Sequence, residues 1–158
     1  MAKRPNILKL ATKISLESMT YTGITYNDPE YKILEPIIDD EMCAIMMHLR
    51  LEANRTVEDV AKRAKQSVEY TQTQLDKLAK TGAVRYRYVD GKRCYFYPIW
   101  VPGIMEGILA NREQCDKYPA TQTSATALRN TPAAVSTWSR PSSTPARPVC
   151  SSCASCPS

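Results

Sequence analysis

The sequence predicts a mainly helical chain with one β-hairpin, arranged as a winged helix-turn-helix domain. Three observations predict this class. Three short segments with apolar residues at helical spacing follow one another between residues 40 and 81. The period then changes to the alternation of strands. Asp90-Gly91 separates the two β-rich runs, and this is the strongest short hairpin signal, because a type I′ turn needs positive φ at both centres.

The first helix of the core is predicted from about Asp40 to Leu51. Asp39 is its expected N-cap, because its carboxylate can accept a free backbone N–H at the start of the helix. Apolar side chains recur at i, i+3, i+4 and i+7 and form one stripe: Met42, Ile45, Met46 and Leu49. We interpret the methionines as packing residues rather than as cofactor ligands.

The second helix is predicted from Val57 to about Lys65, with Thr56 as its cap. A very short break leads into the third helix, which Ser67 caps. Gly82 is expected to end it, since a residue with positive φ commonly follows a helix. Two helices joined so closely are typical of a helix-turn-helix.

Two strands are predicted at 83–89 and 92–97. A two-residue loop fixes the pairs across the hairpin: Tyr88 with Arg93, Tyr86 with Tyr95, and Val84 with Tyr97. One face is expected to be aromatic and to pack on the helices, and the other to be basic and to meet solvent. The aromatic face consists of Val84, Tyr86, Tyr88, Tyr95 and Tyr97, and the opposite face of Arg85, Arg87, Lys92, Cys94 and Phe96.

Regions on either side of this core complete the predicted organisation. Residues 1–38 form a lead-in with a short helix at about 5–14 and otherwise irregular structure. Its apolar residues are expected to dock on the core: Tyr31, Ile33, Leu34, Ile37 and Ile38. The winged helix domain spans 39–100. A turn and an amphipathic helix, from 104 to about 117, follow within 101–119.

The composition changes at Ala120. Residues 120–158 are rich in Ala, Ser, Thr and Pro and contain no Lys, Asp or Glu. Such a segment cannot bury enough surface to offset its chain entropy, so the whole tail is predicted to be disordered. It is either a genuine flexible linker or the product of a shifted reading frame, and the abrupt change favours the second interpretation.

The charge distribution argues against binding dominated by phosphate contacts. The net charge is +5, but three of the positive charges, Arg129, Arg140 and Arg147, lie in the tail, which leaves +2 for residues 1–119. A nearly neutral body is not typical of proteins that bind through phosphate neutralisation. No apolar run approaches the roughly 20 residues of a membrane span. The start of the chain lacks a signal-peptide core, so we expect a soluble, cytoplasmic protein without a membrane partner.

No catalytic site is recognisable. His48 is the only histidine and has no partners at zinc spacing, and no glycine-rich phosphate loop is present. Cys150, Cys153 and Cys156 have the spacing of an iron–sulfur ligand run, but a fourth thiolate is missing. They are an incomplete metal-ligand set, with accidental enrichment in cysteine as the alternative. We therefore expect no cofactor in this chain.

Nucleic-acid binding is the remaining possibility from the residues. The second helix of a helix-turn-helix, here 67–80, enters the major groove. Gln72 has the chemistry to read adenine, yet Glu69 and Asp76 bring negative charge to the same surface. The basic residues lie instead on the preceding helix and on the wing, which is the predicted hairpin at 83–97. The candidate contacts to nucleic acid or to a protein partner are Lys62, Arg63, Lys65, Gln72, Thr73, Lys77, Arg85, Arg87, Lys92 and Arg93.

Several segments resemble, in order along the chain, one group of oxidoreductases. They are GITYNDPEYKILEP at 23–36, DEM at 40–42, YPIWVPG at 97–103 and NREQCDKYP at 111–119. Together with the winged core they resemble the N-terminal winged helix domain of the 4Fe–4S ferredoxin-like and FAD-dependent pyridine nucleotide-disulfide-type oxidoreductases. In that family the iron–sulfur and flavin domains lie further along the chain. The resemblance thus implies 4Fe–4S and FAD for the full-length family, truncation before the redox domains, and no cofactor residue here.

Three functions follow as hypotheses. The first is a non-catalytic winged helix module of an iron–sulfur/flavin electron-transfer protein, in contact with a protein partner or with the missing redox domains. The second is a winged helix transcriptional regulator that binds double-stranded DNA. The third is a small 4Fe–4S electron carrier that uses the tail cysteines. Whether the chain belongs to an enzyme stays open, because the catalytic domains implied by the resemblance are absent from it.

Overall fold

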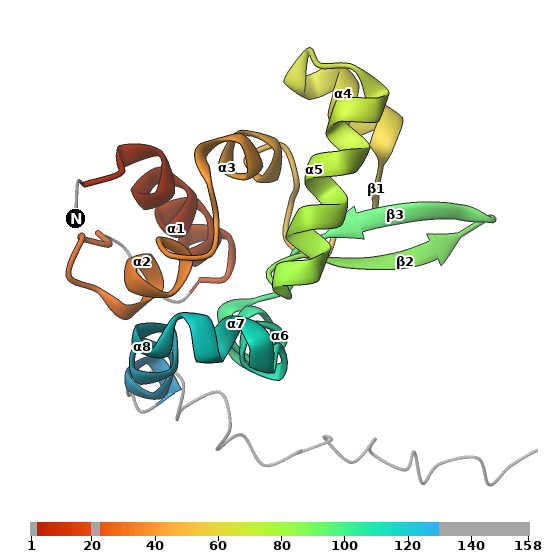
Figure 1. Ribbon diagram of the computed structural model, residues 1–158. Helices are drawn as coiled ribbons and strands as arrows, with labels where there is room; N and C mark the ends of the chain where they lie inside the picture. Colours follow the sequence, from red (N-terminus) through yellow and green to blue (C-terminus); the bar gives the residue numbers. More distant parts are fainter. Residues whose placement is uncertain (1–2, 20–22, 130–158) are drawn as a thin grey trace, which may run out of the picture.

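The computed structural model describes residues 3–19 and 23–129. The described part consists of helices and one small antiparallel sheet, as the sequence predicts. Figure 1 shows helices α1 (Pro5–Glu17), α2 (Pro29–Leu34) and α8 (Pro119–Arg129) on one side of the molecule, while the hairpin projects from the other side. No helix in this part of the chain is long and apolar enough to cross a membrane.

The winged helix-turn-helix occupies the middle of the chain. Its elements are, in order, α3 (Asp40–Met46), β1 (Arg55–Thr56), α4 (Val57–Ala64), α5 (Val68–Thr81), β2 (Arg85–Val89) and β3 (Lys92–Phe96). The three strands are antiparallel in the order β1-β3-β2. The predicted fold class is therefore confirmed. The sequence analysis missed β1, because a two-residue strand has no alternation to detect.

The local signals for the core helices are confirmed in detail. The side chains of Asp39, Thr56 and Ser67 each accept a hydrogen bond from the backbone N–H three residues further on. These bonds satisfy donors that a helix start otherwise leaves free. Gly82 follows α5 with a φ of +83°, in the left-handed region.

The helix α3 is shorter than predicted and ends at Met46 instead of near Leu51. The chain after it joins the sheet. Leu51 forms an isolated bridge with Tyr97, and the Glu52 N–H donates to the Tyr97 carbonyl at 3.0 Å. Pairing with a distant strand thus replaced the last helical turn, which the apolar stripe alone could not reveal.

The hairpin turn and its register agree with the prediction. Asp90 and Gly91 both have positive φ, +49° and +74°. The predicted pairs of Tyr88 with Arg93 and Tyr86 with Tyr95 form, and the ladder ends at Arg85 with Phe96. The predicted pair of Val84 with Tyr97 therefore lies beyond the described strands.

The prediction of one buried aromatic face and one exposed basic face is wrong for half of the hairpin. Tyr95 and Tyr97 are completely buried, but Tyr86 and Tyr88 are 49% and 70% exposed. Cys94, on the face predicted to be exposed, is buried. Burial follows the strand rather than the face, because β3 lies between two strands whereas β2 forms the edge of the sheet.

The segment predicted as a lead-in is part of the main core. α1 begins where expected and extends to Glu17, and the region predicted to be irregular contains α2. The predicted docking is confirmed, since all five residues are at most 7% exposed: Tyr31, Ile33, Leu34, Ile37 and Ile38. Ile7, Leu10 and Ile14 of α1 are fully buried in the same apolar cluster.

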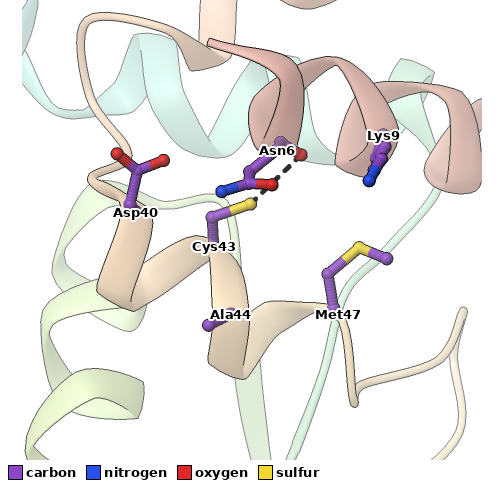
Figure 2. A pocket seen from close by; sticks show the side chains of 6 residues that line it. All are labelled: Asn6, Lys9, Asp40, Cys43, Ala44 and Met47. Atoms are coloured by element: carbon purple, nitrogen blue, oxygen red, sulfur yellow. Dashed lines mark hydrogen bonds between the residues drawn. The ribbon is translucent and has the colours of Figure 1, made fainter.

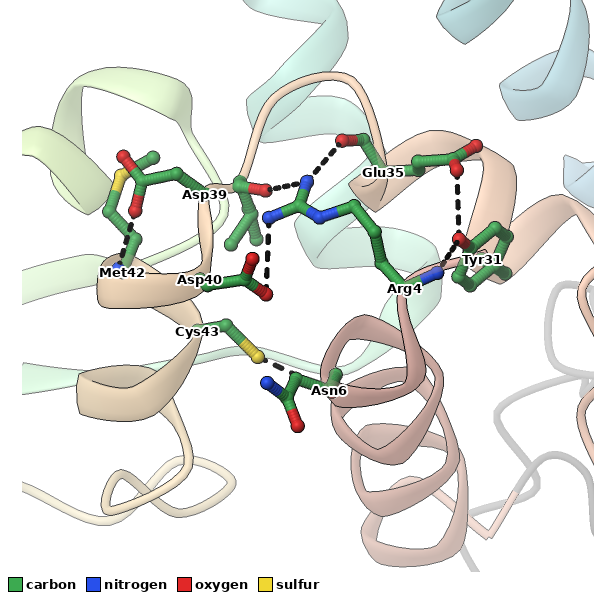
Figure 3. A network of polar contacts seen from close by, with 9 residues as sticks. Arg4, Asn6, Tyr31, Glu35, Asp39, Asp40, Met42 and Cys43 are labelled. Atoms are coloured by element: carbon green, nitrogen blue, oxygen red, sulfur yellow. Dashed lines mark hydrogen bonds and ion pairs between the residues drawn. The ribbon is translucent and has the colours of Figure 1, made fainter. Parts of the chain in front are cut away.

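Polar contacts also fix α1 and α2 to the winged core (Figure 3). The Arg4 guanidinium donates to the backbone carbonyls of Glu35 at 3.0 Å and Ile38 at 2.8 Å, and it pairs with Asp40 at 3.3 Å. The Tyr31 hydroxyl accepts from the Arg4 backbone N–H at 3.0 Å. One arginine thus joins the start of α1 to the end of α2 and to the start of α3.

The single helix predicted from Ile104 to about Lys117 is divided. An irregular turn at Trp100–Ile104 leads into α6 (Met105–Ala110), and α7 (Arg112–Lys117) follows. Asn111 separates the two helices with non-helical backbone angles, φ −86° and ψ 88°, and its side chain caps α7. Asparagine competes with the helical backbone for hydrogen bonds, which explains this break.

The prediction of disorder from Ala120 onward is wrong for residues 120–129, which belong to α8. Figure 1 shows α8 beside α2, and these two helices contact each other. Thr121, Ser124 and Ala125 form a narrow buried stripe. Composition failed here because small side chains bury little area each but allow two helices to approach closely. Residues 130–158, the rest of the predicted tail, lie outside the described part.

Candidate functional site

The ten predicted contact residues lie on three neighbouring elements. Lys62 and Arg63 are on α4, Lys65 follows it, Gln72, Thr73 and Lys77 are on α5, and Arg85, Arg87, Lys92 and Arg93 are on the hairpin. Gln72 and Arg93 are half-buried, and the other eight are exposed. The half-buried pair marks the place where α5 meets the wing.

A hydrogen-bond network joins α5 to the wing at this place. The Gln72 amide donates to the Tyr95 hydroxyl at 2.7 Å and to the Asp76 carboxylate at 2.9 Å. The Tyr95 hydroxyl in turn donates to Asp76 at 3.0 Å. The amide nitrogen of Gln72 therefore points into the protein, whereas reading adenine requires both ends of the amide at the base edge.

Arg93 completes this network. Its guanidinium pairs with the Asp76 carboxylate at 2.9 Å and lies 3.9 Å from the centre of the Tyr86 ring. It is also 4.9 Å from the centre of the Tyr95 ring. The charge of Arg93 is thus compensated and its flat face is occupied, so the surface between α5 and the wing is close to neutral.

The protonation states agree with this geometry. Partial burial by itself raises the pKa of the Asp76 carboxyl, but hydrogen bonds from Gln72 and Tyr95 and the charge of Arg93 outweigh it and lower the pKa. Burial and the neighbouring Asp76 carboxylate raise the pKa of Tyr95 to about 12, although the hydrogen bond from Gln72 lowers it. At neutral pH the network therefore holds an ionised Asp76 and a neutral Tyr95.

The arginines and lysines of the candidate surface differ. Each arginine has a partner in the fold: Arg63 pairs with Asp59 at 3.3 Å, Arg85 donates to the Gly103 carbonyl at 3.3 Å, Arg87 pairs with Glu52 at 3.2 Å and Arg93 pairs with Asp76. Within residues 3–19 and 23–129, no ion pair is formed by Lys62, Lys65, Lys77 or Lys92. Exposed pairs contribute little, about 0–1 kcal/mol, so the arginines at the surface can exchange partners.

Metal and redox chemistry find no support in the described residues. No group of three or more potential ligands is arranged to hold a metal ion there. The predicted incomplete set, Cys150, Cys153 and Cys156, lies outside these residues. His48 is half-buried, and its burial, together with the charges of Lys13 and Arg63, lowers its pKa.

A small cleft between α1 and α3 contains a cysteine, Cys43, whose thiol is a candidate nucleophile (Figure 2). Its volume is about 190 Å³, and it is lined by Asn6, Lys9, Asp40, Cys43, Ala44 and Met47. The Cys43 thiol donates to the Asn6 carbonyl at 3.3 Å, and burial, with the charge of Asp40, raises its pKa to about 11. An un-ionised thiol is a weak nucleophile, and ligand pockets are typically larger, roughly 300–1,000 Å³. The cleft therefore does not supply a catalytic site.

Sequence reasoning missed the way α5 and the wing neutralise each other. One feature of the sequence could have indicated this network. Gln72 and Asp76 are four residues apart and so lie on the same face of a helix. The cross-strand placement of Arg93 beside Tyr86 also followed from the predicted register. Only the packing of the hairpin against α5 brings the two sets together.

Comparison of the chain with protein-family models, with curated proteins and with solved structures finds no match. The resemblance to an oxidoreductase family therefore stays a prediction.

Proposed function

We propose that this chain is a non-catalytic winged helix interaction module that contacts protein and does not read DNA. One observation carries the proposal. Two of the polar α5 side chains that would face a major groove, Gln72 and Asp76, are engaged with Tyr95 and Arg93 of the wing. Breaking these contacts would leave the hydroxyl of the buried Tyr95 without its partners, at a cost of about 1–3 kcal/mol.

The charges on α5 support the same proposal. Glu69 is exposed in the first turn of the helix, and Asp76 follows two turns later. Inserting α5 into a groove would bring both carboxylates towards phosphates or base edges, and like charges repel. A protein surface imposes no such uniform negative potential.

The partner that we propose is a redox protein. The basis for this step is the sequence resemblance to iron–sulfur and flavin oxidoreductases, whose domains would bind 4Fe–4S and FAD. In this proposal the winged helix mediates contacts within an electron-transfer assembly. Among the described residues, no group of three or more potential ligands is arranged to hold a metal ion.

A titration with labelled random-sequence duplex DNA tests the proposal. It is carried out at about 50 and about 200 mM salt, a range over which proteins that make six to ten phosphate contacts lose roughly 10³–10⁵ in affinity. We expect no duplex binding that depends on salt in this way. Tight, salt-sensitive binding would show that the chain is a DNA-binding protein.

The alternative function, a DNA-binding regulator, has one observation in its favour. Four exposed lysines on α4, α5 and the wing form no ion pair within the described residues. This alternative predicts that replacing Arg85 and Arg87 with alanine weakens duplex binding and reduces its salt dependence. An unchanged salt slope in that variant would count against it.

A further inference from the structure

The strand β2 forms an open edge of the sheet. Its residues Arg85–Val89 pair only with β3 within the described part, because β3 lies between β1 and β2. Figure 1 shows the hairpin projecting beyond α5, with no other helix or strand drawn along the outer side of β2. An open edge presents a row of backbone groups to which another chain can pair.

The register identifies the residues that face this edge. Val89 and Lys92 flank the two-residue turn and form a hydrogen-bonded pair, and such pairs alternate along an antiparallel ladder. Arg87 and Arg85 therefore also direct their N–H and C=O groups towards β3. Tyr86 and Tyr88 direct theirs outward, and no other described residue bonds to these groups.

The same two residues expose their rings. Tyr86 is 49% and Tyr88 is 70% exposed, and their ring centres are 6.3 Å apart at nearly a right angle. Arg93 lies against the Tyr86 ring and holds it in place. A free backbone edge and a platform of two tyrosine side chains therefore coincide on one strand.

We propose that the β2 edge, defined by Tyr86 and Tyr88, binds an extended acidic segment of a protein partner as an added strand. This inference rests on the proposed function, since it names the surface and the partner chemistry of the same module. Backbone hydrogen bonds would supply affinity, and side chains that alternate between the two faces would supply selectivity.

Charge decides between an acidic partner and a second copy of the chain. Arg85 and Arg87 lie on the opposite face of β2 from the tyrosines, and Lys92 pairs across the ladder on that face. Two β2 strands paired antiparallel about their centre would place Arg87 opposite Arg87 of the other copy. Like charges directly opposite each other are destabilising, whereas carboxylates at these positions would be attracted.

Arg87 is available for such an exchange. Its present partner Glu52 is 55% exposed, and the Arg87 side chain is 44% exposed. An ion pair between exposed groups contributes little to stability, so a carboxylate of the partner can replace Glu52 at small cost. The Arg87 guanidinium also lies over the Phe96 ring, 4.0 Å from its centre, which limits the directions in which the charge points.

Hydrogen exchange of the full chain, alone and with peptides, tests the inference. The free protein should show fast exchange for the backbone amides of Tyr86 and Tyr88 and slow exchange for Arg87 and Val89. The probe is a labelled peptide of about ten residues that alternates threonine and glutamate, and its control replaces each glutamate with lysine. We expect the glutamate peptide, and not the lysine peptide, to protect Tyr86 and Tyr88.

Two matched variants isolate the backbone contact. Tyr88→Pro removes an outward N–H without removing a ladder hydrogen bond, and Tyr88→Ala removes the same ring but keeps the N–H. The proline variant should bind the glutamate peptide roughly two- to tenfold more weakly than the alanine variant. Equal affinities, or no protection of Tyr86 and Tyr88 in the unaltered chain, would overturn the inference.

Two further probes, duplex DNA and oligothymidylate, distinguish a failure of this inference from a failure of the proposed function. If neither the glutamate peptide nor duplex DNA binds, the edge inference is overturned and the proposed function is not. Salt-sensitive duplex binding would overturn the proposed function and this inference with it. Binding of oligothymidylate that perturbs the Tyr86 and Tyr88 rings would overturn the inference in favour of single-stranded nucleic acid, which stacks on aromatic side chains.

Discussion

Gly82 and Gly107 face each other backbone to backbone where the end of α5 crosses α6. A Cβ atom on either glycine would collide with the backbone carbonyl of the other. Gly82 also has positive φ, whereas Gly107 lies within the helix α6. The contact joins the end of α5 to the helices that follow the sheet.

Gly107→Ala should therefore destabilise the protein. Alanine in a helix interior normally adds stability, about 1 kcal/mol relative to glycine, so the steric clash has to outweigh this gain. We expect the free energy of unfolding to fall by about 1–3 kcal/mol, as for an overpacked core, measured by urea denaturation. An increase in stability would contradict the close contact.

A comparison of two glycines with similar backbone angles isolates the same contact. Gly82 and Gly91 have φ of +83° and +74°, but only Gly82 has atoms within reach of an added Cβ. Gly82→Ala should reduce stability more than Gly91→Ala, which introduces only backbone strain. If both variants lower the urea midpoint by the same amount, backbone strain from the positive φ alone explains the loss of stability.

Ala125→Asp tests whether α8 docks on α2. Ala125 is fully buried, so the substitution places a carboxylate in an apolar contact and should lower the free energy of unfolding by about 1 kcal/mol or more. Ala127→Asp is the matched control, because Ala127 is exposed on the same helix. If both variants unfold at the same urea concentration, α8 does not contribute to the fold.

Tyr95→Phe tests the network between α5 and the wing. It removes the hydroxyl that accepts from Gln72 and donates to Asp76, and we expect a loss of about 0.5–1.5 kcal/mol, because Gln72 and Asp76 each lose one hydrogen bond but remain bonded to each other. Tyr88→Phe makes the same chemical change at a residue that is 70% exposed, and it should alter stability by no more than about 0.5 kcal/mol. Thermal unfolding of both variants at matched concentration provides the measurement.

The raised pKa of Tyr95 predicts that the stability of the protein depends on pH in the alkaline range. The neutral phenol is favoured in the folded state, so its contribution to stability is complete below the ordinary tyrosine pKa of 10.0 and is lost as pH rises through about 12. The stability difference between the parent chain and Tyr95→Phe should therefore shrink over this interval. A difference that stays constant would show that the hydroxyl does not titrate as the network requires.

Glu17 predicts a pH dependence on the acidic side. Burial by itself raises the pKa of this carboxyl. Hydrogen bonds from the Tyr97 hydroxyl at 2.5 Å and the Leu51 N–H at 2.9 Å, with the charges of Lys13 and Arg50, outweigh burial and lower the pKa below the ordinary glutamate value of 4.5. The ionised Glu17 therefore stabilises the fold fully above about pH 4.5. This contribution is lost as the pH falls through the lowered pKa that the carboxyl has in the folded protein.

Glu17→Gln should thus cost more stability at about pH 7 than at about pH 3. Urea denaturation of the variant and the parent chain at both pH values gives the comparison. Glu113→Gln is a suitable control, because Glu113 is exposed and forms no ion pair within the described residues. A loss that is equal at both pH values would contradict the lowered pKa.

The local elements of this protein follow from short stretches of its sequence. Asp39, Thr56 and Ser67 start their helices, Gly82 ends α5, and Asp90-Gly91 forms the turn between β2 and β3. Each of these features depends on hydrogen bonds or backbone angles within a few residues. Short-range interactions therefore suffice to predict where these elements begin and end.

Which parts of these elements are exposed depends on the tertiary structure. Tyr86 and Tyr95 lie opposite each other on one face of the hairpin, yet Tyr95 is buried and Tyr86 is not. A third strand pairs with the other side of β3, whereas no strand among the described residues pairs with the outer edge of β2. The docking of α8 and the pairing of Arg93 with Asp76 likewise join segments that are distant in sequence. Burial depends on what lies on the far side of a residue, and that is a property of the whole chain.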